Sequence, residues 1–248
     1  MNNAFFDTPT RAHRIGSWRP AGFAALLLIG AVPAALAGRP LQTEDAGILE
    51  RGDCELEAVL ERAGSGPEQA RGQGRGLGCG LAPGLQAGVA VAAVKAGDGR
   101  SRAAGLGAKW LLAGAADDGP RLAVTAGVEW LREPGLGWKA AGAGLGLVAS
   151  VPAGPGTVHA ALGHGRDRLG RLDTTSWGLA WEADERPLAG LAWAPMAELV
   201  GDDRDGAAFN LGLRLTAVAD RLWFDASWGR AFSGSRERVL TLGAKWAF

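Results

Sequence analysis

Charged residues recur at every second position within short apolar stretches of this 248-residue chain. Strand side chains alternate between two faces, so these charges would share one face while leucine, valine and tryptophan occupy the other. The charges expected on the shared inner face are Glu55, Glu57, Glu61, Lys109, Glu129, Glu182, Arg214, Asp225 and Lys245. Such side chains can line an aqueous passage that selects polar solutes by charge. They can equally pair with one another and fill a sealed interior.

Two cysteines, Cys54 and Cys79, lie at equal distances from the centre of a predicted turn between Gly66 and Pro67. They would therefore face each other across a β-hairpin, and in an oxidising compartment a disulfide is predicted. The alternative is two free thiols, because a shift in hairpin register would separate them. No CxxC pair or histidine cluster accompanies them, so no metal site is expected.

Histidines and glycine-rich runs do not indicate catalysis or a cofactor. A nucleophile needs a base within hydrogen-bond reach, and the residues two positions after His159 and His164 are Ala161 and Arg166, which carry no hydroxyl. The alternating glycines, such as those in residues 142–146, do not complete a GxGxxG motif and instead indicate one face of a strand. The formal net charge is zero, which does not favour a nucleic-acid partner.

The first 37 residues have the pattern of a secretory signal peptide. Arg11, Arg14 and Arg19 precede an apolar run at residues 21–34, and Ala35-Leu36-Ala37 resembles a small-residue cleavage site. We therefore expect residues 1–37 to be removed on export. The alternative is an uncleaved membrane anchor, although the apolar run is at the short limit for spanning a bilayer.

From Gly52 onward, short alternating stretches are separated by breaks rich in Gly, Pro and Asp. They predict an all-β fold, a transmembrane up-and-down antiparallel β-barrel of about 12 strands over residues 52–248. Lipid requires apolar side chains outside and tolerates polar ones inside, as this pattern provides. The alternative, a soluble exported barrel, would need an apolar interior, where this chain has Gly, Glu, Lys and Arg.

The breaks suggest an alternation of tight turns and longer loops. An even number of strands would place both termini on the periplasmic side, with the longer loops outside. The ninth strand is expected near residues 188–194, where Pro195 indicates a bulge or a strand end. The tight turns are expected at residues 82–84, 152–156, 183–187 and 217–220, and the loops at 62–72, 95–102, 165–173, 198–206 and 230–238.

The final stretch places Leu240, Leu242, Ala244, Trp246 and Phe248 on one face. It resembles the closing strand of bacterial outer-membrane barrels. That resemblance implies that Trp246 and Phe248 form an insertion signal for the barrel-insertion machinery, and that outer-membrane lipid surrounds the barrel.

Residues 38–51, here called the leader, show neither strand alternation nor a helical pattern. Together with residues 52–57, they contain Arg39-Pro40-Leu41, then Thr43 to Gly47, then Gly52 and Glu55-Leu56-Glu57. This is similar to the leader of a family of outer-membrane proteins often labelled as transporters of the phenol meta-cleavage pathway. The resemblance implies passive uptake of a small solute, hydrophobic or aromatic in character.

The leader would be either a periplasmic tail or a plug folded into the lumen. The rival function is a structural or adhesive barrel with a sealed lumen, whose external loops, such as residues 165–173, bind partners.

Overall fold

The computed structural model describes residues 41–64, 69–114, 119–232 and 238–248. The expected signal peptide and the first three leader residues, 38–40, lie outside the described residues. No helix in the described part of the chain is long and apolar enough to cross a membrane.

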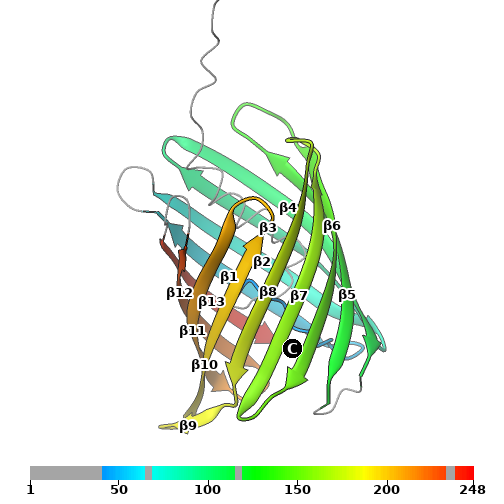
Figure 1. Cartoon of the computed structure of the whole chain (residues 1–248), viewed down its shortest axis with the longest axis vertical. Coiled ribbons are helices and arrows are strands. Elements are labelled where there is room, and N and C mark those ends of the chain that lie inside the picture. The colour runs from blue at the N-terminus through cyan, green and yellow to red at the C-terminus, as the bar shows by residue number, and fades with distance from the viewer. Residues whose placement is uncertain (1–40, 65–68, 115–118, 233–237) are drawn as a thin grey trace, which may run out of the picture.

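Twelve long antiparallel strands close into a barrel, as the sequence predicts (Figure 1). Each pairs with its neighbours along the chain, and the last strand pairs with the first. The closure ends in two backbone bonds of 2.9 Å between Cys54 and Phe248, each N–H donating to the other carbonyl. The strands are β1 (Cys54–Ala63), β2 (Ala70–Ala82), β3 (Leu85–Ala96), β4 (Gly99–Ala113), β5 (Arg121–Arg132), β6 (Lys139–Pro152), β7 (Gly156–Asp167), β8 (Leu172–Ala183), β10 (Leu191–Asp202), β11 (Gly206–Val218), β12 (Leu222–Ala231) and β13 (Arg238–Ala247), with a short β9 (Arg186–Leu188) that pairs only with β10.

The two faces of the barrel wall have the polarity expected for a lipid environment. Outward side chains are large and apolar, such as Leu106 and Leu145, which are 48% and 64% exposed. Inward positions carry buried polar side chains, among them Gln86, Thr125 and Asn210. A protein dissolved in water would bury the first set and expose the second, so this barrel is built to lie in a membrane.

The predicted disulfide between Cys54 and Cys79 is confirmed. The two residues are directly opposite in the β1–β2 register, and their Cα atoms are 4.2 Å apart. The Cys54 N–H points to β13, where it donates to Phe248 O. Towards β2 the pair is therefore of the non-hydrogen-bonded type, in which antiparallel side chains approach most closely.

The barrel has two ends, called here the termini end, where Cys54 and Phe248 lie, and the far end. Trp246 and Phe248 lie at the termini end, 52% and 59% exposed, with ring centroids 5.1 Å apart. Three of the described far-end connections are shorter than predicted. Strands β3 and β4 are joined at residues 97–98, β7 and β8 at 168–171, and β10 and β11 at 203–205. The expected contrast between tight turns and long loops is therefore wrong at these three positions.

The ninth strand, β10, neither ends at Pro195 nor shifts its register there against β11, so both expectations for Pro195, a strand end or a bulge, are wrong. Strand β10 pairs with β9 at residues 191–193 and with β8 from Met196 to Asp202. Pro195 falls between these two pairings, where a missing N–H costs the sheet least. Glu198, which the sequence suggests is in a loop, therefore lies within a strand and on the inward face.

Candidate functional site: the lumen and the leader inside it

The structure places the predicted inner-face charges on the inward side of the wall. Six are buried and three are partly exposed. The buried ones are Glu55, Glu57, Lys109, Glu129, Arg214 and Asp225, and the partly exposed ones are Glu61, Glu182 and Lys245. They do not form one ring of charge. Several of them form separate local groups, whereas others stand apart.

The largest group is centred on Arg214. Its Nε donates to Asp225 Oδ1 at 2.9 Å, and its Nη1 donates to Glu182 Oε1 at 2.7 Å. Asp225 is directly opposite on β12, whereas Glu182 reaches across from β8. The second oxygen of Glu182 lies 3.8 Å from His159 Nε2. Buried charges are stable only when paired and hydrogen-bonded, and Arg214 meets that condition with two carboxylates.

A second group lies near the termini end, around Lys245. Its Nζ is 3.3 Å from Glu55 Oε2 and lies 5.0 Å from the centre of the Trp223 ring. Glu55 is diagonal to Lys245, because Lys245 is opposite Glu57 in the β1–β13 register. Diagonal pairs remain within reach of long side chains, so both charges are held along the wall.

Two predicted charges stand apart from these groups. Glu129 is buried, and its Oε1 has no hydrogen-bond partner among the described residues. Glu61 lies near the far end of β1 and forms no ion pair within the described part of the chain. The structure thus brings together only part of the predicted set.

The described leader residues lie inside the barrel, where Glu198 holds the first of them. The N–H groups of Gln42 and Thr43 donate to the two carboxylate oxygens of Glu198 at 2.8 and 2.7 Å. Asn210, opposite Glu198 in the β10–β11 register, donates to Oε1 at 2.6 Å. Leu41 packs against Ala180 and Met196 on the same part of the wall.

Lys109 holds the middle of the leader. Its Nζ forms an ion pair with Glu44 at 2.9 Å and donates to the carbonyls of Asp45 and Gly47 at 2.9 and 3.2 Å. An ammonium group has three N–H donors, so the leader satisfies all of them. The inward charge predicted at position 109 therefore faces the leader directly.

Near the termini end, the leader lies in close contact with inward-facing glycine residues of the wall. The N–H of Leu49 donates to Gln86 Oε1 at 3.1 Å, and the N–H of Gly52 donates to Gly80 O at 3.0 Å. A Cβ at Gly80 would lie 1.9 Å from the Glu50 carbonyl oxygen, so no other residue fits there without moving the leader. A Cβ at Gly178 would likewise lie 2.5 Å from Thr43 Oγ1. These two inward glycines make room for the leader.

A serine–histidine pair in the wall also contacts the leader. Ser150 Oγ is 2.8 Å from His159 Nδ1 and accepts the N–H of Ala46 at 2.8 Å. The two side chains are opposite each other on β6 and β7. The sequence analysis considered only hydroxyl groups two positions after each histidine, so it did not find this partner on the neighbouring strand. The pair is buried, and its hydroxyl is engaged by the leader.

Among the described residues, no cluster of three or more His, Cys, Asp or Glu side chains is arranged to hold a metal ion. Sequence reasoning missed Glu198, Ser150, Gln86 and Asn210 as leader contacts. A signal for Glu198 was present, because Trp193, Ala197 and Leu199 continue the apolar alternation on the opposite face of its strand.

No protein-family model and no curated protein matches the chain. Among solved structures, the barrel is similar to the translocator domain of the autotransporter NalP from Neisseria meningitidis, with 12% identity, a TM-score of 0.52, and coverage of 92% of this chain and 96% of that domain. It is also similar to the NanC porin, with 10% identity, a TM-score of 0.51, and coverage of 77% and 98% respectively. The KdgM porin in complex with disordered oligogalacturonate gives 10% identity, a TM-score of 0.50, and coverage of 78% and 99%. The chain therefore has the fold of outer-membrane porins and translocator barrels.

Proposed function

We propose that the protein is a passive outer-membrane channel for a small solute, and that its own leader closes the lumen. The observation that carries this proposal is the set of contacts between the leader and the wall. Between Gln42 and Arg51, the leader is bonded to residues of β10, β4, β6 and β3, and Arg51 forms a β-bridge with Gly80 of β2. A segment held on so many sides of the lumen obstructs it.

The chemistry of these contacts favours a removable plug over a permanent filling. Most are single hydrogen bonds between the leader backbone and wall side chains, and water can replace each of them. The wall beneath carries Thr125, Ser227 and Thr241, polar groups that would remain satisfied in a wet lumen. No large side chain is fully buried within the described part of the chain. Withdrawal of the leader would leave a polar passage.

The membrane is inferred from the apolar outer face, and the orientation from the position of the termini. We place the termini end in the periplasm, where the oxidising environment suits the Cys54–Cys79 disulfide. We expect the barrel-insertion machinery to deliver the chain to the outer membrane. The solute class, small and hydrophobic or aromatic, rests on the resemblance of the leader to that of the phenol meta-cleavage transporter family.

A second candidate is a structural barrel whose lumen stays sealed. The observation in its favour is that Arg214, Lys109 and Lys245 are each paired with a carboxylate. Its adhesive form has less support, because residues 168–171 form a short connection where a long external loop was expected.

The experiment that separates the two candidates is single-channel conductance in a planar bilayer, with and without residues 38–51. Heat-modifiable gel mobility confirms that each protein is folded. The proposal expects brief openings in the full chain and steady conductance after removal of the leader. Silence from both folded proteins would favour the sealed structural barrel.

A further inference from the structure

Four cations form an unbroken row on the outward face at the far end of β1 to β4. Arg62 is directly opposite Arg71, Arg71 is opposite Lys95, and Lys95 is opposite Arg100. All four side chains are exposed. They share the strand face that carries outward leucines such as Leu60.

Among the described residues, the row has no paired counter-charge. Like charges directly opposite on neighbouring strands destabilise a sheet, and here three such pairs follow one another. Within the described part of the chain none of the four forms an ion pair, and Arg71 has one long hydrogen bond, of 3.5 Å, to Gln69. Among the described residues, the acids nearest in sequence are Glu61, which is on the inward face of β1 and also lines the hollow described below, and Asp98 in the β3–β4 turn. An external anion would relieve this repulsion.

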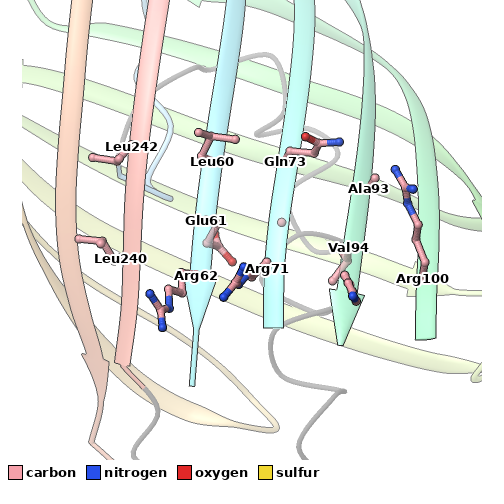
Figure 2. A pocket seen from close by; sticks show the side chains of 12 residues that line it. Leu60, Glu61, Arg62, Arg71, Gln73, Ala93, Val94, Arg100, Leu240 and Leu242 are labelled. Carbon is pink, nitrogen blue, oxygen red and sulfur yellow. The ribbon is translucent and has the colours of Figure 1, made fainter. Parts of the chain in front are cut away.

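The cations border a hollow whose other side is apolar. The hollow has a volume of about 490 Å³, and its lining includes the four cations and Leu60, Leu240 and Leu242 (Figure 2). These leucines are 57%, 46% and 49% exposed. They lie further from the far end of their strands than the cations do.

We propose that this hollow binds a phosphorylated lipid, with the head-group phosphate on the arginines and an acyl chain along the leucines. Guanidinium groups bind phosphate through paired hydrogen bonds, and a row of them at the membrane surface attracts anionic head groups. The leucines face the hydrocarbon layer, where an acyl chain is the available partner. A free phosphate ion would use the cations and leave the leucines without a role. This inference rests on the proposed membrane location, but not on channel activity.

The test compares the wild type with two double variants. Arg71→Gln with Lys95→Gln removes the two central charges of the row. Arg168→Gln with Arg171→Gln removes two exposed charges at the far end of β7 and β8, outside the row. Each refolded protein is titrated, by native mass spectrometry in detergent, with lipid A, a glycolipid that carries two phosphates. Dephosphorylated lipid A, the deacylated phosphorylated sugar and inorganic phosphate serve as comparison ligands.

We expect the row variant to bind lipid A about tenfold or more weakly than the wild type, and the control variant to bind like the wild type. Loss of either the phosphates or the acyl chains should weaken binding to the wild type. Equal lipid A binding by all three proteins would overturn the proposal. Equally tight binding of inorganic phosphate or the deacylated sugar would reduce the site to a free-anion site and overturn the lipid assignment. Conductance of the row variant, measured in parallel, keeps this result separate from channel function.

Discussion

Replacement of Glu198 by Gln tests whether the leader is held by the contacts described above. Glu198 accepts the N–H groups of Gln42 and Thr43 on its two oxygens and also accepts Asn210. Glutamine has the same shape but only one oxygen acceptor, so one leader N–H would face an amide NH2 instead of a carboxylate. The contact between residue 198 and the leader therefore loses its negative charge and one hydrogen bond.

A hydrogen bond to a charged group contributes roughly 1.5–3 kcal/mol. Each 1.4 kcal/mol changes an equilibrium about tenfold, so the ratio of released to bound leader should rise by about 10- to 150-fold. If leader release opens the channel, single-channel recordings of Glu198→Gln should show open probability rising by one to two orders of magnitude until it saturates. The conductance of each opening should stay near the wild-type value.

Glu129→Gln is the matched control, because it makes the same carboxyl-to-amide change in the buried wall, at a residue that has no contact with the leader among the described residues. It should leave open probability near the wild-type value. If Glu198→Gln, shown to be folded, opens no more often than the wild type, Glu198 does not hold the leader in the lumen. If Glu129→Gln opens as often as Glu198→Gln, loss of any lumen carboxyl group is sufficient and the leader contact has no special role.

Three other substitutions test the leader contacts and the disulfide. Lys109→Met removes the ion pair to Glu44 and two hydrogen bonds to leader carbonyls, so hydrogen exchange at residues 43–49 should accelerate at least tenfold. Unchanged exchange would contradict the role of Lys109. Gly80→Ala should displace the leader and raise open probability. Gly78→Ala, whose Cβ would have its nearest neighbour at 3.5 Å, should resemble the wild type. Equal open probability in the two variants would show that the leader does not lie against Gly80. Cys54→Ala with Cys79→Ala opens a loop with a sequence separation of 25 residues. The free energy of unfolding in lipid vesicles, measured by urea titration, should fall by about 3 kcal/mol. Wild-type protein in reductant should show the same loss.

The barrel was predictable because its signal is repeated on every strand. Alternation at Leu240, Leu242 and Trp246 requires no knowledge of distant residues, and lipid imposes the same rule all round the wall. The disulfide was predictable for a related reason, since a hairpin's symmetry places Cys54 opposite Cys79 without any tertiary information. Both depend on local geometry alone.

The lumen was less predictable, because its contacts join residues far apart in the chain. The bond from Thr43 to Glu198 spans 155 positions, and the leader has no periodicity from which its path could be inferred. The Ser150–His159 pair escaped a search at fixed local spacing because its register depends on the β6–β7 turn. In the sequence Pro195 indicates a bulge or a strand end, because the change of pairing partner that accommodates it is visible only in the sheet.

The most direct test of the central claim is to lock the leader in the lumen and record conductance. Thr43→Cys with Gly178→Cys suits this purpose, because a Cβ built at position 178 lies 3.2 Å from Thr43 Cβ, close to the separation in a disulfide. The wild type and the single Gly178→Cys variant, each with and without reductant, control for the native disulfide and for added bulk. With the cross-link verified by mass spectrometry, we expect silence under oxidising conditions and the return of openings on reduction. Openings that persist with the leader cross-linked in place would contradict the claim that the leader closes this channel.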